Sequence, residues 1–293
     1  MIRLAVLLVG VSLLPQPAHA TPIALTPPAS LLFVGSGGGL GDNRGAYVTA
    51  TANFGVTHVG IALSLFPSAG TTLIADIYAA SGFGRGPLLS SATANIQSSG
   101  TAIQFYDVPI FFSFASGVDY DISIRFPNWT FPQGDPAINL VRYYEFEPFF
   151  GSVPFNVAGL VTVRDGEASG CAQCNGLLPH LQLTVSEPMV TSLTATPSVL
   201  WPPNHKMIPV SVTVTATGYP SPACQISSIV SSESSTKPGQ VEWALTGPLS
   251  ADLRAERAGA GPGRLYTIEV NCTNGPGTSS SGFVTVTVPH DQR

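Results

Sequence analysis

Charged residues are scarce in this chain of 293 residues. Asp, Glu, Lys and Arg make up 10% of the sequence, and 12 basic residues face 17 acidic ones, a formal net charge of −5. Nucleic-acid binding requires clustered Lys and Arg, so this composition excludes a nucleic-acid partner. With 44% hydrophobic residues and so little charge, the chain can bury enough apolar surface to fold, which excludes wholesale disorder.

Catalytic motifs are missing as well. The sequence has no Gly-x-Ser-x-Gly and no His-Glu-x-x-His, and its histidines are scattered. Asp119 and Asp121 are two positions apart and share one side of an expected strand, whereas the carboxylates of a glycosidase flank the substrate. We therefore expect no enzyme, no metal site made by side chains and no cofactor; the alternatives are a hydrolase with an unrecognised site and a structural calcium ion held by backbone carbonyls.

The chain has one long apolar run, and it lies at the start. Arg3 precedes LAVLLVGVSLL, which is too short to span a bilayer, and Ala18-His19-Ala20 fits the small-x-small rule for signal peptidase. Residues 1–20 therefore read as a cleavable signal peptide. We expect the mature protein to be secreted, extracellular or periplasmic, without membrane insertion after cleavage.

The remainder lacks the period of an amphipathic helix and shows the period of β-strands. Apolar residues alternate with polar ones in 120–126, 210–215, 266–272 and 284–288. In the first of these segments the pattern turns Asp121, Ser123 and Arg125 toward water. Gly (30) and Pro (26) separate such segments. We expect an all-β fold of two β-sandwich domains, at residues 23–186 and 190–290, joined by the polar segment SEPMVT.

Cysteine is limited to Cys171, Cys174, Cys224 and Cys272. In an exported protein four cysteines predict two disulfides, and three pairings exist. We expect Cys171–Cys174 and Cys224–Cys272, because each pair then stays within one domain.

The segment LWPPNHKMIPVSVTV begins at Leu200 and is rich in proline at its start. Pro202 and Pro203 cannot donate ladder hydrogen bonds, so the first strand of the second domain should switch sheets there. Trp201 would then be a core plug between the sheets. The alternative is a contact site made by Trp201, His205 and Lys206.

Three segments of the second domain, in this order, resemble bacterial extracellular Ig-like modules, the class that includes hyaline-repeat domains. They are SVLWPPNHKMIPVSVTVTA, WALTGPLSADLRAERAGAGPGRLYTIEVNCT and GFVTVTVPHDQ. The resemblance implies a sandwich of about seven strands that acts as a spacer or adhesive unit. In the first domain, GTTLIADIYAASGFGRGPLLSSA, TAIQFYDVPIFFSF and ASGVDYDISIRF resemble the jelly-roll-like domains of exported bacterial proteins, which implies fold more than function.

Aromatic residues gather in the 30 residues from Phe126 to Phe155. Several lie among Pro and Gly, so some rings should be exposed and form a binding surface. The candidate ligand-binding residues are Trp129, Tyr143 and Tyr144, with Asp135 and Arg142 as polar partners.

Two interpretations of function follow for a secreted, non-catalytic protein. In the first, the N-terminal sandwich binds a glycan or cell-surface polymer and the Ig-like module is a spacer. In the second, the chain is a structural or adhesive surface protein without a small ligand. An exposed groove around Trp129 favours the first interpretation, and a buried Trp129 favours the second. Two convergent carboxylates in a cleft would favour the hydrolase.

Overall fold

The computed structural model describes residues 20–25, 31–36, 43–81, 84–130, 133–145, 154–168, 177–234, 239–259, 261–275 and 278–291. All regular secondary structure in these ranges is β-strand, which confirms the expected all-β class. None of these ranges contains a helix long and apolar enough to cross a membrane. Residues 1–19 of the expected signal peptide lie outside the described residues. Cys171 and Cys174, which we expected to form a disulfide, lie outside them as well.

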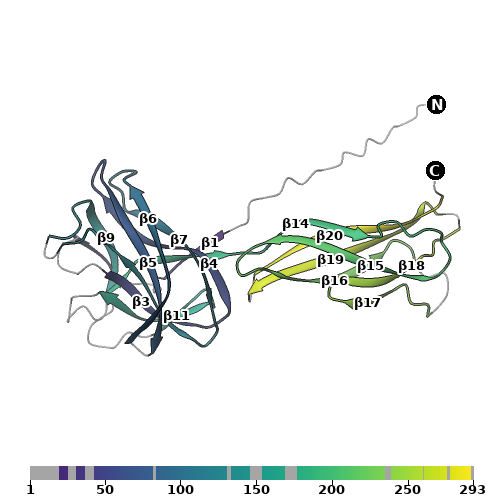
Figure 1. Ribbon diagram of the computed structural model, residues 1–293, viewed down its shortest axis with the longest axis horizontal. Coiled ribbons are helices and arrows are strands. Elements are labelled where there is room, and N and C mark those ends of the chain that lie inside the picture. The colour runs from purple at the N-terminus through teal and green to yellow at the C-terminus, as the bar shows by residue number, and fades with distance from the viewer. Residues whose placement is uncertain are drawn as a thin grey trace.

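The N-terminal strands form two antiparallel sheets that share one hydrophobic core, here called the N-terminal sandwich (Figure 1). The seven-stranded sheet has the order β1 (Ala20–Ala24), β13 (Leu181–Ser186), β4 (Phe54–Leu65), β9 (Ile138–Glu145) and β12 (Leu177–Pro179), with β2 (Leu31–Ser36) paired to β9 and β7 (Gln104–Phe114) to β4. The six-stranded sheet has the order β10 (Phe155–Val157), β11 (Val161–Ala168), β3 (Asn43–Ala50), β8 (Asp119–Arg125), β5 (Gly70–Ser81) and β6 (Gly84–Gln97).

Apolar residues at alternate positions along the strands fill this core. Tyr120, Ile122 and Ile124 of β8 are all buried on the same side, as their spacing predicted. The Tyr120 ring packs edge-on against Phe114 with centroids 4.9 Å apart, and Phe114 stacks on Phe54 at 4.7 Å. These rings tie β4 and β7 of one sheet to β8 of the other.

The C-terminal strands form the C-terminal sandwich. Its four-stranded sheet has the order β14 (Met189–Thr196), β15 (Met207–Thr217), β18 (Ser250–Arg254) and β17 (Trp243–Gly247). Its three-stranded sheet has the order β16 (Ala223–Ser231), β19 (Gly263–Gly275) and β20 (Thr278–Pro289). Lettered A to G along the chain, the sheets are ABED and CFG, the order of a constant-type immunoglobulin fold.

The first strand of the C-terminal sandwich does switch sheets, but earlier than Pro202. Strand β14 pairs with β15 as far as Thr196, and after Pro197 the chain joins β20 through a parallel bridge between Val199 and Thr287. The Leu200 backbone N–H donates to the Thr287 carbonyl at 2.8 Å. The crossover therefore occurs at Pro197.

The predicted core position of Trp201 is wrong. Leu200 is buried in the core, and Trp201 is 42% exposed. Neighbouring residues in extended backbone point to opposite sides, so when Leu200 fills the core the next side chain turns outward.

A close backbone contact joins the two sandwiches, which lie end to end in Figure 1. The Tyr219 N–H donates to Ser186 Oγ at 2.7 Å, and Asn274 Nδ2 donates to the carbonyls of Ser186 (2.9 Å) and Tyr219 (3.2 Å). Gly55 of β4 is essential to this approach, since a Cβ there would lie 2.0 Å from the Tyr219 carbonyl oxygen. The junction lies at the end of β15 that is farthest from Met207.

Candidate functional site

The structure places two of the predicted ligand-binding residues, Trp129 and Asp135, in the interior. Trp129 is 8% exposed and lies against Phe126, with ring centroids 5.7 Å apart. The Asp135 carboxylate is buried; it accepts a hydrogen bond from Thr71 Oγ1 at 2.5 Å and one from the Ala137 N–H at 2.9 Å. These residues hold the segment between β8 and β9 in place, and the exposed ring surface expected at Trp129 is absent there.

The other predicted residues lie on β9, which pairs with β2 on one side and with β12 and β4 on the other. Arg142 is half-buried, and its carbonyl accepts the His180 N–H at 2.9 Å. The side chains of Tyr143 and Tyr144 lie outside the described residues. The sequence shows that this strand contains aromatic residues, but it does not show on which side of the sheet their rings lie.

Strand β8 is buried on both faces, which corrects the expectation that Asp121, Ser123 and Arg125 face water. Asp121 and Ser123 are fully buried, and Arg125 is only partly exposed. The reason is that β8 is an inner strand, between β3 and β5, and long side chains of neighbouring strands lie across it. Arg85 of β6 reaches over to Asp121 at 2.6 Å.

Ion pairs of this kind recur along the outer face of the six-stranded sheet. Three carboxylates there are each matched by an arginine: Asp76 by Arg125, Asp121 by Arg85, and Asp119 by Arg164. The set is charge-neutral, so it offers no excess charge to a ligand. Carboxylates that are each paired with an arginine also differ from the two opposed carboxylates of a glycosidase, which must reach a substrate.

Asp76 is the most heavily engaged of the three. Besides Arg125 it accepts hydrogen bonds from Ser91 Oγ at 2.6 Å and Tyr78 Oη at 3.2 Å. Burial, followed by the negative charge of Asp76, raises the pKa of Tyr78. The Arg85 guanidinium lies 4.3 Å above the Tyr78 ring. The arrangement locks three strands together and is best understood as structural.

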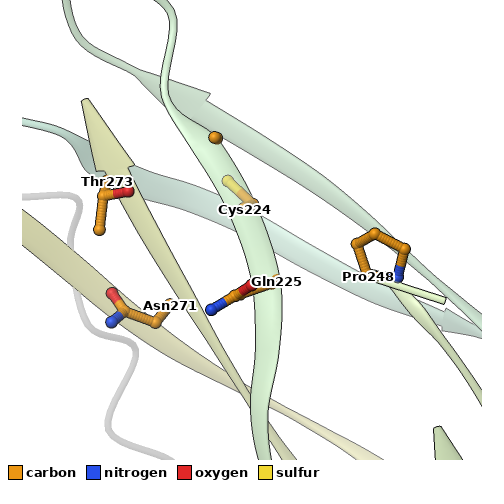
Figure 2. A pocket seen from close by; sticks show the side chains of 6 residues that line it. Cys224, Gln225, Pro248, Asn271 and Thr273 are labelled. Carbon is orange, nitrogen blue, oxygen red and sulfur yellow. The ribbon is translucent and has the colours of Figure 1, made fainter. Parts of the chain in front are cut away.

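The C-terminal sandwich contains the expected Cys224–Cys272 disulfide, which is confirmed. It joins β16 to β19 within one sheet, where Cys224 and Cys272 are register partners. A cavity of about 330 Å³ lies beside it, lined by Ala223, Cys224, Gln225, Pro248, Asn271 and Thr273. Figure 2 shows Gln225 and Asn271 next to each other on the two strands. Because no lining residue is ionisable, the cavity offers hydrogen bonds but no acid–base chemistry.

The described residues contain no group of three or more His, Cys, Asp or Glu side chains that could hold a metal ion. A second polar cluster instead lies at the far end of the C-terminal sandwich. Arg264 is buried and forms ion pairs with Glu242 and, at 3.6 Å, with Glu233. Its Nη1 donates to Tyr266 Oη at 3.1 Å, and burial raises the pKa of that tyrosine.

The segment 201–206 lies over this cluster and carries the residues of the alternative contact site. Trp201, Asn204, His205 and Lys206 are all exposed. The segment is held at its base, because the His205 N–H donates to the Ala255 carbonyl and the Ala255 N–H donates to the Lys206 carbonyl, both at 2.9 Å. The structure thus brings the three residues of the alternative contact site together on one exposed loop.

Comparison with known proteins adds no relative: no protein-family model, no curated protein and no solved structure matches this chain. The fold and the candidate sites therefore rest on the geometry described above. They define a two-sandwich, all-β protein whose second sandwich has the immunoglobulin strand order.

Proposed function

We propose that this chain is an exported, non-catalytic binding and adhesion protein that contacts its partner through the C-terminal sandwich, with the N-terminal sandwich as a rigid support. The observation that supports this is the distribution of exposed apolar side chains. Of the 13 large apolar residues exposed in the described ranges, eight belong to the C-terminal sandwich: Val199, Trp201, Val230, Val241, Trp243, Leu245, Leu265 and Phe283. A contiguous apolar patch marks an interaction site on a soluble protein, whereas single exposed residues are common, so the neighbouring residues among these eight carry the proposal.

The most concentrated part of this surface is the edge formed by β17. Trp243 and Leu245 occupy alternate positions of β17 and therefore point to the same side of the sheet, and Val241, just before the strand, is exposed as well. β17 is an end strand of its sheet, and its sequence WALTG contains neither charge nor proline; Glu242 directly before it is turned to Arg264, and Pro248 lies in the turn directly after it. Exposed edges of this composition readily pair with another chain.

The end strand β6 of the N-terminal sandwich is built differently. It also exposes apolar residues, Leu88 and Leu89, but Arg85 and Pro87 stand directly before them. Charge and proline are the means by which proteins keep edge strands from pairing. The contrast supports β17, and not β6, as the adhesive edge.

Burial of Trp129 and Asp135 directs the proposal toward the adhesive interpretation and away from glycan binding by the N-terminal aromatic cluster. A buried indole has no free face on which a sugar ring could stack. The matched ion pairs of Asp76, Asp119 and Asp121 likewise give no support to a hydrolase.

Two matched variants test the proposal. Leu245→Lys and Leu88→Lys each place a charge on an end strand, at positions 52% and 53% exposed. Binding of the labelled mature chain to envelope preparations of the producing cells should fall about tenfold or more for Leu245→Lys, the loss typical of one good apolar anchor. Leu88→Lys should leave it unchanged. Equal binding by both variants, or equal loss, would contradict the proposal.

A further inference from the structure

The loop 201–206 lies at the opposite end of the C-terminal sandwich from the junction with the N-terminal sandwich. Strand β15 runs from Met207, next to this loop, to Thr217, next to Tyr219 at the junction. An 11-residue strand is roughly 36 Å long, so the loop is far from the N-terminal sandwich. The distal end of an elongated support is where a contact loop can reach a partner first.

We propose that this loop binds an anionic polysaccharide whose sugar units carry carboxylates. Trp201 supplies a face for a sugar ring, and Lys206 and Arg254 supply cations for the carboxylates. The inference rests on the proposed binding function and adds a second contact to it, separate from β17.

The indole of Trp201 is available for stacking. It is 42% exposed, while Leu200 directly before it is buried and fixes the register of the segment. The outward position of Trp201 is thus set by the fold. A flat, rigid aromatic ring gains contact area with the C–H face of a sugar ring at little cost in conformational entropy.

Two cations, Lys206 of the loop and Arg254 beside it, form no ion pair within the described residues. In the described part of the chain, no carboxylate oxygen lies within 4.0 Å of the side-chain nitrogens of Lys206 or Arg254. Arg254 donates from Nε to the Val241 carbonyl at 2.7 Å and from Nη1 to the His205 carbonyl at 2.8 Å. A guanidinium carries five N–H donors, so three remain for a carboxylate.

The acid that contacts the loop, Glu256, does not present its carboxylate on the outer surface. It is buried beneath the loop, where it accepts a hydrogen bond from Gln240 Nε2 at 2.6 Å and lies 3.3 Å from His205 Nδ1. Its oxygens therefore lie inside the sandwich, where His205 and Gln240 engage them, while Lys206 is exposed and Arg254 is partly exposed.

The loop is held in a fixed shape before any ligand arrives. His205 adopts φ = 64°, a left-handed conformation that non-glycine residues rarely take. Its N–H and carbonyl are both bonded, to Ala255 and Arg254 respectively, and Lys206 N–H donates to Asn204 Oδ1 at 3.1 Å. Such conformations persist only where the surroundings enforce them, and pre-organisation of this kind lowers the entropy lost on binding.

The number of contacts favours a polymer over a single sugar. Lys206 and Arg254 are two cations, and a ligand with one carboxylate per sugar unit needs at least two linked units to pair with both. A nucleic acid is also a polyanion, but the chain as a whole has a net charge of −5, which would repel so dense a charge.

The test measures binding of the full mature chain to polygalacturonate, a polysaccharide with one carboxylate per sugar, by affinity electrophoresis. Neutral dextran and duplex DNA are the comparison polymers. We expect polygalacturonate to bind at 50 mM salt, to weaken at 500 mM salt, and to be preferred over both other polymers. Trp201→Ala should weaken binding about tenfold, and Lys206→Gln about threefold with a smaller salt dependence.

Trp243→Ala is the matched control, because Trp243 is 37% exposed but lies on β17. It should keep polygalacturonate binding, and Trp201→Tyr should keep most of it. Equal binding of dextran, stronger binding of DNA, or equal loss in Trp243→Ala would overturn the inference. Loss of envelope binding in Leu245→Lys with no binding of polygalacturonate would overturn this inference alone and leave the proposed function standing.

Discussion

The surfaces of the two sandwiches differ in which side chains are paired or covered and which are exposed. In the N-terminal sandwich, carboxylates on the outer face of the six-stranded sheet are closed off by arginines from neighbouring strands, and the aromatic residue Trp129 is buried. In the C-terminal sandwich, Trp201 and Trp243 remain exposed, one on a loop and one on an edge strand. A surface that satisfies its own polar groups needs no partner, whereas exposed apolar surface gains free energy when a partner covers it. The comparison supports the proposal that the first sandwich is the support and the second makes the contact.

Their interiors differ as well. Within the described residues, the core of the N-terminal sandwich contains 31 buried apolar residues and that of the C-terminal sandwich contains 15. Stability from burial scales with the apolar area removed from water, so the smaller core needs another source of stability. The Cys224–Cys272 disulfide supplies it.

The largest expected effect therefore comes from removing this disulfide. The double variant Cys224→Ser, Cys272→Ser opens a loop with a sequence separation of 48 and should destabilise the C-terminal sandwich by about 4 kcal/mol in the chain-entropy account. In differential scanning calorimetry the transition of the C-terminal sandwich should move to lower temperature, and that of the N-terminal sandwich should stay. Equal shifts of both would show that the two sandwiches unfold as one unit.

Breaking an ion pair of the N-terminal sandwich should have the next largest effect. Asp76→Ala removes a fully buried carboxylate that accepts hydrogen bonds from Arg125, Ser91 and Tyr78, so we expect a loss of about 2 kcal/mol in urea unfolding at neutral pH. Asp119→Ala is the control, since the Asp119 side chain is 27% exposed where that of Asp76 is fully buried, and besides its ion pair it accepts one hydrogen bond, from Thr49 Oγ1; we expect a loss of about 1 kcal/mol. Similar small losses in both variants would mean that the buried pairs do not hold the sheet together.

The strands of this fold could be predicted from the sequence wherever one face is apolar. The alternation of Tyr266, Ile268 and Val270 has one physical meaning, a strand with its apolar side in a core, and the structure has it so. The pattern failed at Asp121 and Ser123, because a polar residue on an inner strand is covered by long side chains from strands distant in sequence. Only the strand order, β3-β8-β5-β6, reveals that cover.

The candidate sites were predicted less well, for a related reason. Proline indicates that a ladder is broken but not at which of several prolines, so the crossover was placed at Pro202 instead of Pro197 and Trp201 was assigned to the core. The aromatic cluster among Pro and Gly predicted an exposed ring at Trp129. The ring is buried instead, because it packs on Phe126. The β17 edge was missed; its signal was a short, uncharged strand without proline.

The smallest expected effect is a pH dependence of stability that should differ between the two sandwiches. Burial, with a further contribution from Arg142, lowers the pKa of His180 in the N-terminal sandwich to about 4. The unfolded chain takes up this proton near pH 6.5, and the folded chain only near pH 4. The stability from the neutral imidazole is therefore complete above pH 6.5 and is lost as the pH falls toward 4. The ring keeps some contact with solvent, so we expect a loss of about 2 kcal/mol or less.

His180→Gln should remove this part of the pH dependence from the N-terminal transition, while carboxylate titration remains. The transition of the C-terminal sandwich is the internal control, because His180 lies outside it, and its pH dependence should be the same in His180→Gln as in the unchanged chain. If His180→Gln retains the full slope between pH 6.5 and 4, the carboxylates of the matched ion pairs, and not the buried imidazole, set the acid sensitivity of the supporting sandwich.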